Sequence, residues 1–448
     1  MRRIFCGVVF AAFASTMITA SPAPSIDAAF ERFWAARNTG DAKKAAEDVV
    51  RSGVTFDDAL ARLKRGRQYD RPASHDVVHE MRRAAAGDFT YDVFLPEGYD
   101  PQHRYQVRFQ LHGGVMMREQ NEEPGRGRGG PRSPLRGAEQ IYVMPAAWRE
   151  APWWSAIQLD NLDTILDRLK RTYNVDENRI VVSGVSDGAT GTFYVAMRDT
   201  TPYASFASLN GSIMVLANDR LDVGGELFPT NLLNKPFFIV NGGRDPLYPT
   251  RAVEPYVEHL RRSGVTVDYK PQPDGVHNTA WWPEVKDEFE TFVRQHPRNP
   301  LPSHVTWEAT DHQVPSRAHW IVIERVKGAD RNRAVEPRLE PDLNVFTGDG
   351  INKGRELFSR ARPSGRVDVE QAGNAVRART SGVAELTVLI SPDAFDLSKP
   401  VTVTVHDRVV YDARVEPSVA TLMKWAARDN DRTMLFGGEI HVSVAARP

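Results

Sequence analysis

The sequence predicts an α/β protein with a doubly wound, mainly parallel sheet, preceded by a short helical segment and followed by an all-β, sandwich-like domain. Between about residues 89 and 296, short apolar runs alternate with amphipathic helical patterns, as in parallel strands covered by helices. Before this region the apolar spacing is helical, and beyond residue 303 it is mostly strand-like. A chain of 448 residues is long enough for two or three domains.

Residues 1–20 have the pattern of a secretory signal peptide, with a basic start and an apolar run from Ile4 to Ile18. The run is short for a transmembrane helix, although an uncleaved anchor is the alternative. Cys6 is the single cysteine and lies inside this segment, so the mature chain would contain no disulfide. We expect an exported protein, in a bacterial periplasm or secreted, with no stable membrane span after cleavage.

The charges are balanced, with 57 basic and 58 acidic residues and a net charge of −1. This balance gives no reason to expect nucleic acid or an acidic membrane surface as a partner. The histidines lack the paired spacing of zinc sites, so we predict neither a metal nor a cofactor. The sequence gives no basis for assigning an oligomeric state.

Residues 21–80 are expected to form a helical segment that packs on the central domain. Phe30, Phe33 and Trp34 have the i, i+3, i+4 spacing of one helix face. Thr55, three residues before Asp58, predicts a helix start. No catalytic pattern occurs in this segment.

The central domain is assigned to residues 81–297. Its strands are expected at 89–96, 105–111, 141–145, 179–183, 206–211, 236–241 and 266–270. Its helices are expected after residue 188 and at 159–173, 251–263 and 282–296. The long loop 119–137 is of a kind that is usually functional or disordered, and its arginines either solvate the loop or attract an acidic substrate: Arg126, Arg128 and Arg132.

A Pro- and Arg-rich linker leads to the β-rich domain, residues 303–448. Strands are expected at 305–309, 319–323, 384–390, 401–405, 408–411 and 439–444, with one helix at 418–428. This pattern favours a β-sandwich.

The stretch Gly-Val-Ser-Asp-Gly at 184–188 follows a β-branched run and precedes small residues that can enter a helix. In this strand–turn–helix context, G-x-S-x-G forms a turn that presents a nucleophilic serine, here Ser186. The flanking glycines let strand and helix approach closely. The G-x-S-x-G pattern alone also occurs by chance, so the interpretation depends on whether a catalytic acid and histidine follow it in the sequence.

Two partners follow in the required order. Asp245 lies in the loop after the strand at 236–241, and His277 lies in the loop after the strand at 266–270. Loops at the carboxyl ends of parallel strands converge. His277 would then accept the proton of Ser186, and Asp245 would orient the imidazole. Asp219 and Asp222 are the alternative acids.

His-Gly-Gly at 112–114 ends an early strand, where backbone amides can stabilise an oxyanion. We predict the amides of Gly114, Val115 and Asp187 as these donors and give the side chain of Asp187 no role. Four tryptophans adjoin strand ends and either line a substrate site or pack in the core: Trp153, Trp154, Trp281 and Trp282.

Together these motifs resemble the α/β-hydrolase superfamily over residues from about 80 to 297. The similar branch contains dienelactone hydrolases, feruloyl and acetylxylan esterases, and polyhydroxybutyrate depolymerases. Residues 91–96 through 112–114 are similar to the opening hairpin and oxyanion segment of that branch, and the Gly-x-x-Asp-x-x-x-Pro loop ending at Pro249 is similar too. A departure is Val276, inserted where many relatives have Gly-His directly.

The resemblance implies an exported serine hydrolase that cleaves a small-molecule or polymeric carboxylic ester through an acyl-serine intermediate. One alternative is a serine peptidase of the prolyl-oligopeptidase type, although the N-terminal stretch is too short and too helical for a propeller. Another is a non-catalytic binding protein on a hydrolase scaffold.

Overall fold

The computed structural model describes residues 23–72, 77–84, 87–120, 134–135, 137–221, 223, 226–310, 316–328, 339–340, 343, 345–346, 355–356, 358 and 363–444. The predicted signal at 1–20 and the arginines Arg126, Arg128 and Arg132 lie outside these ranges. Within these ranges no helix is both long and apolar enough to cross a membrane.

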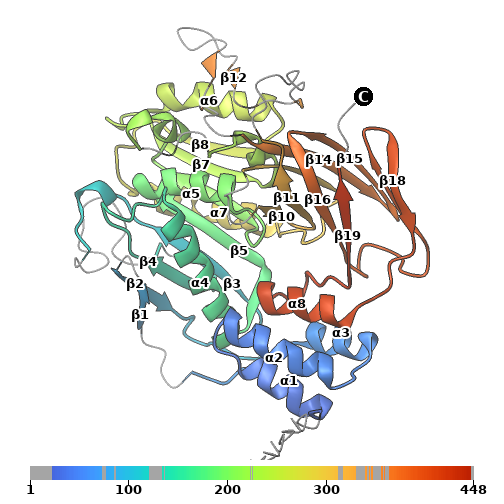
Figure 1. The fold of residues 1–448 in the computed structure, drawn as a ribbon. Helices are drawn as coiled ribbons and strands as arrows, with labels where there is room; N and C mark the ends of the chain where they lie inside the picture. The colour runs from blue at the N-terminus through green and yellow to red at the C-terminus, as the bar shows by residue number, and fades with distance from the viewer. Residues whose placement is uncertain are drawn as a thin grey trace, which may run out of the picture.

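The central domain is built on an eight-stranded sheet in the order β1-β2-β4-β3-β5-β6-β7-β8, in which β2 alone runs against the others (Figure 1). The predicted doubly wound, mainly parallel sheet is confirmed. The strands are β1 (Val78–Ala84), β2 (Gly87–Phe94), β3 (Tyr105–Leu111), β4 (Ile141–Pro145), β5 (Val175–Val185), β6 (Ser205–Leu209), β7 (Phe237–Gly242) and β8 (Val267–Gln272).

Helices cover both faces of this sheet because alternate strand residues point to opposite sides. Apolar residues on one face, such as Val182 and Phe206, share a core with three helices, and those on the other, such as Val181 and Phe238, pack on a fourth. The first three helices are α4 (Ala156–Thr172), α5 (Asp187–Arg198) and α6 (Thr250–Arg262), and the fourth is α7 (Trp282–Gln295).

The expected opening hairpin between residues 89–96 and 105–111 is not formed. β4 lies between β2 and β3, and the antiparallel partners of β2 are β1 and β4. All seven residues of β3 are buried, so this strand belongs in the sheet interior with a parallel neighbour on each side. β1 escaped prediction because its residues are mostly polar and none is fully buried.

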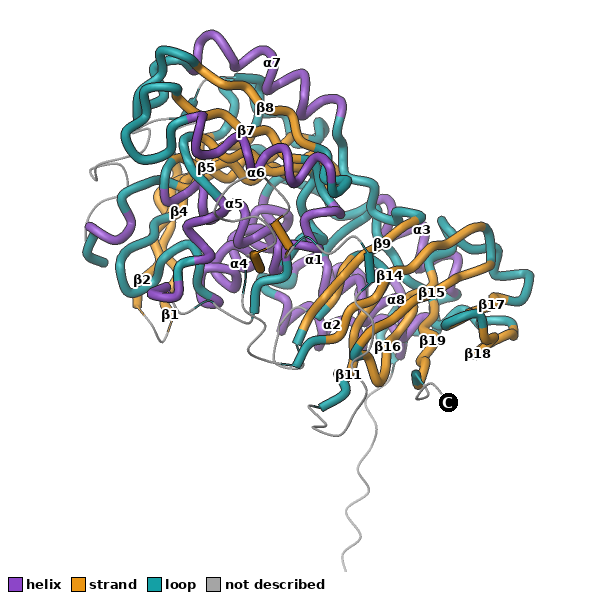
Figure 2. Tube along the Cα trace, turned by 90° about the horizontal axis from the view of Figure 1, so that it is seen from above, coloured by secondary structure: helices purple, strands orange, loops and turns teal. Residues whose placement is uncertain are grey.

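The C-terminal domain contains a four-stranded sheet, β10-β11-β16-β19, and a five-stranded sheet, β18-β17-β15-β14-β9, and Figure 2 shows its strands as a group apart from those of the central sheet. The sheets share one apolar core. Their strands are β9 (His304–Ala309), β10 (Arg317–Ala318), β11 (Ile321–Val326), β14 (Gly365–Ala372), β15 (Ala375–Ser381), β16 (Val383–Ile390), β17 (Val401–Val405), β18 (Arg408–Ala413) and β19 (Gly438–Ser443). A separate two-stranded pair is formed by β12 (Val345–Phe346) and β13 (Arg355–Glu356).

The N-terminal helices α1 (Ile26–Ala35), α2 (Thr39–Arg51) and α3 (Phe56–Arg65) form a core with α8 (Val419–Asp429) of the C-terminal domain. Phe30 and Phe33 belong to the same buried cluster as Leu422 and Met423, and Figure 1 shows the blue helices beside the red α8. The segment was expected to pack on the central domain. Its main partner is instead α8, because the apolar faces of α1–α3 and α8 cover one another.

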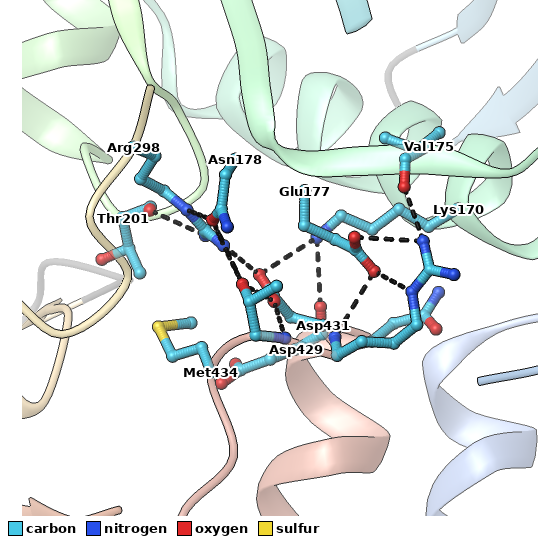
Figure 3. A network of polar contacts seen from close by, with 12 residues as sticks. Lys170, Val175, Glu177, Asn178, Thr201, Arg298, Asp429, Asp431 and Met434 are labelled. Atoms are coloured by element: carbon cyan, nitrogen blue, oxygen red, sulfur yellow. Dashed lines mark hydrogen bonds and ion pairs between the residues drawn. The ribbon is translucent and has the colours of Figure 1, made fainter. Parts of the chain in front are cut away.

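Buried ion pairs join the central domain and the linker that follows it to the loop after α8 (Figure 3). Arg298 Nη2 lies 2.7 Å from Asp431 Oδ2, and Arg432 Nε lies 2.6 Å from Glu177 Oε1 on β5. Burial alone would raise the pKa of Asp431, but the cations of Arg298 and Lys170 hold that pKa below its ordinary value. Removing one partner from such a pair leaves a buried charge, which costs several kcal/mol, so these contacts fix how the two domains meet.

A recess of about 820 Å³ lies at this junction, among α4, the end of α5, the loop before α2 and the residues after α8. Asp163 lines this recess with an exposed side chain and hydrogen bonds to Asp199. The protein around the carboxyl group limits hydration of its charged form, and this effect, followed by the charge of Asp199, raises the pKa of Asp163 well above its ordinary value. Lys170 opposes this effect at Asp163, and Arg317 and Arg428 lower the pKa of Asp199. The two carboxyl groups therefore favour sharing one proton.

We expect Asp163→Asn to stabilise the protein increasingly as the pH rises. The folded protein keeps a proton on Asp163 that the unfolded chain releases, so wild-type stability falls as pH rises from the ordinary pKa toward the raised folded one. The asparagine amide can donate to Asp199 without losing a proton. Urea unfolding midpoints between about pH 5 and about pH 9 measure the effect, with Asp287→Asn on the exposed face of α7 as the control. Parallel curves for wild type and Asp163→Asn would contradict the expectation.

Candidate active site

Ser186 stands between the end of β5 and the first residue of α5, with φ 57° and ψ −116°. A non-glycine residue rarely adopts positive φ, and such strain concentrates at functional sites. A backbone hydrogen bond helps to hold Ser186 in this conformation, because its amide donates to the Leu209 carbonyl at 3.0 Å. A Cβ added at Gly184 would lie 2.1 Å from the Gly188 carbonyl oxygen, and one at Gly188 would lie 2.1 Å from that of Leu111. Both flanking glycines are therefore required by close backbone approach.

The structure brings Ser186, His277 and Asp245 together in one hydrogen-bonded chain. His277 Nε2 lies 3.0 Å from Ser186 Oγ, and His277 Nδ1 lies 2.8 Å from Asp245 Oδ2. Because a carboxylate only accepts hydrogen bonds, Nδ1 carries the proton and Nε2 is left to accept from the serine. The Asp245 side chain is fully buried, and its other oxygen accepts the amides of Leu247 at 2.8 Å and Tyr248 at 3.0 Å.

The loops after β7 and β8 are tied together, which places acid and histidine side by side. The Gly243 amide donates to the Gln272 carbonyl at 2.7 Å, and the Arg244 amide donates to the Gly275 carbonyl at 2.9 Å. A Cβ added at Gly242 would lie only 2.3 Å from the Gly275 carbonyl oxygen. The extra residue Val276 therefore does not keep His277 from reaching Ser186.

The segment at 112–114 is braced by His112, whose structural role the sequence did not reveal. Burial, followed by the nearby Arg118, lowers the pKa of His112 to about 3, so its ring is neutral. Its Nε2 accepts the Ala147 amide at 3.0 Å, and its carbonyl accepts the Trp153 indole N–H at 2.8 Å. The oxyanion segment is thus fixed from its N-terminal side.

The predicted oxyanion donors do not all have free amides. Gly114, at φ 69°, leads into the short 3-10 helix η1 (Val115–Met117). The Val115 amide donates to Asp187 Oδ2 at 2.7 Å. This contact corrects two expectations: Val115 has another partner, and the Asp187 side chain has a role beyond that of its backbone. The Gly114 amide also hydrogen bonds to this carboxylate, so the amide of Asp187 remains the candidate donor.

No family model matches this sequence, and no curated protein matches it. A thermostable esterase of known structure is 20% identical, with a TM-score of 0.39 over 50% of this chain and 63% of that one. A ferulic acid esterase is 17% identical, with a TM-score of 0.37 over 49% of this chain and 98% of that one. An acylaminoacyl peptidase from Pyrococcus horikoshii is 15% identical, with a TM-score of 0.38 over 50% of this chain and 42% of that one. This chain thus spans less than two thirds of the thermostable esterase.

Three features are characteristic of the same known fold: the sheet order, the strained turn at Ser186, and the order Ser186, Asp245, His277 along the chain. The chain has an α/β-hydrolase fold.

In this hydrolase fold, the four tryptophans proposed as substrate walls are buried, with exposed fractions of 1–5%. Trp153 and Trp154 belong to the core shared with α4, α5 and α6, and Trp281 and Trp282 belong to the core shared with α7. The Arg108 guanidinium lies 4.7 Å from the Trp282 ring centroid. The structure therefore favours core packing and corrects their assignment to substrate binding.

Exposed apolar residues lie within the catalytic loops instead, and the sequence reasoning missed them. Met116 and Met117 follow the oxyanion segment with exposed fractions of 45% and 69%. Leu247, two residues after Asp245, is 60% exposed, and Val276, beside His277, is 43% exposed. Their signal in the sequence is the presence of large apolar residues inside the loops that carry the catalytic side chains. We call these four residues the apolar rim.

Other candidate groups add little to the site. In the part of the chain that the structure describes, no three His, Cys, Asp or Glu side chains gather to hold a metal ion. Asp222 and the side chain of Asp219, the alternative acids, lie outside the described residues. Tyr248 lies beside the histidine, with ring centroids 5.8 Å apart. Burial, followed by the charges of Asp187 and Asp245, raises the pKa of Tyr248 to about 12, so its hydroxyl is neutral.

Proposed function

We propose that the protein is a serine hydrolase that cleaves carboxylic esters through an acyl-serine intermediate. The observation that carries this proposal is the hydrogen-bonded chain from Ser186 through His277 to Asp245, with distances of 3.0 and 2.8 Å. All three residues lie in the loops or turns at the carboxyl ends of the parallel strands β5, β7 and β8, where ligands bind in such sheets.

In the first half of the reaction, Ser186 Oγ attacks the ester carbonyl carbon while His277 Nε2 accepts its proton. Asp245, buried and already hydrogen-bonded to Nδ1, stabilises the imidazolium that forms. The Asp187 amide donates to the developing oxyanion, and such a donor contributes roughly 10²–10³ in rate. His277 then returns the proton to the departing alkoxide, so that the alcohol leaves and the acyl group remains bonded to Ser186 Oγ.

In the second half, His277 removes a proton from a water molecule that attacks the acyl-serine carbonyl. The tetrahedral intermediate uses the same amide donor, and its collapse releases the carboxylic acid and restores the Ser186 hydroxyl. No redox partner or metal is required for this balance of atoms and charge.

The apolar rim supports a substrate with an apolar group near the reacting carbonyl. Met116, Met117, Leu247 and Val276 expose large side chains beside the catalytic loops, and a substrate that covers them removes apolar surface from water. Each methylene removed from water is worth about 0.8 kcal/mol, which corresponds to roughly a fourfold gain in kcat/KM if the transition state keeps the contact. Butyryl or hexanoyl esters are therefore favoured over acetyl esters.

A comparison of wild type with Ser186→Ala tests the proposal, with Ser263→Ala, at the end of α6, as a control for serine removal. Wild type and control should be labelled by a fluorophosphonate probe and should cleave p-nitrophenyl hexanoate faster than the butyrate and acetate. Ser186→Ala should do neither. Faster cleavage of aminoacyl arylamides than of esters would favour a peptidase. A folded wild type that resists labelling would overturn the catalytic interpretation.

A further inference from the structure

The end of β6, with the residues that follow it, contacts both the nucleophile turn and the loop that carries the histidine. The Leu209 carbonyl accepts the Ser186 amide at 3.0 Å, and Asn210 Nδ2 donates to the Asn278 carbonyl at 2.6 Å. A Cβ added at Gly211 would lie 2.4 Å from a side chain of α5, so the chain here also packs directly on the helix that begins after the nucleophile. Successive residues therefore join the nucleophile turn to the histidine loop.

Asn210 is held in one conformation by its surroundings. It is fully buried, has φ 53°, and its backbone amide donates to the Val240 carbonyl at 2.8 Å. Positive φ is uncommon for a residue other than glycine, and asparagine is among the residues that tolerate it. No donor among the described residues reaches its Oδ1, and a buried oxygen without a partner costs stability. The side chain therefore serves as a donor, and its Nδ2 group anchors the histidine loop.

His277 is anchored through the backbone on both of its sides. Before it, the Gly275 carbonyl accepts the Arg244 amide at 2.9 Å, and after it, the Asn278 carbonyl accepts Asn210 Nδ2. The residues directly before and after the histidine are exposed, so packing alone does not hold this part of the loop. The first anchor comes from the acid loop, and the second comes from the strand that also holds the nucleophile turn.

We propose that Asn210 is a positioning residue that keeps His277 Nε2 within hydrogen-bond reach of Ser186 Oγ. Because Asn210 directly follows the residue that accepts the Ser186 amide, adjacent residues of the chain hold the nucleophile and the base. Asp245 orients the imidazole ring at Nδ1, whereas Asn210 fixes the backbone that carries the ring. This inference rests on the proposed esterase function.

The test compares Asn210→Gly with a matched control, Asn234→Gly. Glycine adopts positive φ freely, so the first change removes the carboxamide and keeps the backbone path. Asn234 ends the 3-10 helix η4 (Pro229–Asn234), near the amino end of β7, and its Nδ2 donates to the Thr306 carbonyl at 2.6 Å. We expect Asn210→Gly to lower kcat for a p-nitrophenyl ester by roughly 10²-fold with little change in KM, because a misplacement of about 1 Å can cost that factor. Asn234→Gly should keep kcat close to wild type.

Two further measurements separate positioning from a loss of stability and from the proposed function itself. The proton that His277 Nδ1 shares with Asp245 gives a downfield NMR resonance without any substrate, and this resonance should broaden in Asn210→Gly and not in Asn234→Gly. Asn210→Ser, whose shorter hydroxyl does not reach the Asn278 carbonyl, should show the same losses and replaces the glycine variant if that variant does not fold. A folded variant at position 210 with the resonance and kcat of Asn234→Gly would overturn the inference. A wild type that resists fluorophosphonate would instead remove the proposed function, and the resonance would still decide whether Asn210 positions His277.

Discussion

His277→Ala is expected to lower kcat for ester cleavage by roughly 10⁶-fold, because no other group takes the proton from Ser186. Its Nε2 is 3.0 Å from Ser186 Oγ, and a serine hydroxyl is a weak nucleophile at neutral pH without such a base. The fold should survive the change. Asp245 keeps the amides of Leu247 and Tyr248 as hydrogen-bond donors.

The measurement is kcat with a p-nitrophenyl ester, together with the urea unfolding midpoint of each variant. His103→Ala provides the control, because His103 is an exposed histidine in the turn before β3. It should leave kcat close to wild type. A folded His277→Ala that keeps kcat within about tenfold of wild type would show that the base lies elsewhere, since a general base alone contributes at least 10².

Asp245→Asn is expected to lower kcat by roughly 10⁴-fold while leaving the geometry almost unchanged. The Leu247 and Tyr248 amides need an acceptor, so the asparagine oxygen faces them and its NH₂ group faces His277 Nδ1. That nitrogen must then accept a hydrogen bond, which moves the ring proton to Nε2. A protonated Nε2 donates toward Ser186 and cannot take its proton.

The same ester assay measures this loss, and Asp274→Asn is the matched control. Asp274 is an exposed carboxylate three residues before His277 that pairs with Arg244 at 2.7 Å. Its variant should keep kcat near the wild-type value. An Asp245→Asn enzyme within about tenfold of wild type would require a different orienting acid.

The apolar strands and the order of the catalytic residues could be predicted because short-range patterns determine both. β3 alternates apolar residues with polar ones, β7 opens with an apolar run, and both are buried in the sheet. Ser186, Asp245 and His277 each follow a strand. β14 and β15 were missed because most of their residues are polar, so that few apolar residues, such as Val367 and Val376, mark the alternation.

The contacts that could not be predicted join segments distant in sequence. An amphipathic pattern shows that α1–α3 have an apolar face, but it does not indicate that this face packs against α8. The contact of Asp187 with Val115 depends on the backbone path through Gly114, which residue types alone do not give. The tryptophans were ambiguous for a similar reason, since the faces they present depend on the packing of whole helices.

The shared core of α1–α3 and α8 has a consequence for synthesis of the chain. Phe30 and Phe33 leave the ribosome long before their partners Leu422 and Met423, which lie far along the chain. The helices α1–α3 therefore carry an uncovered apolar face until synthesis has passed α8. Contacts of such long sequence separation form slowly, and exposed apolar surface promotes aggregation in the interval. A chain that stops before residue 419 lacks the covering helix altogether.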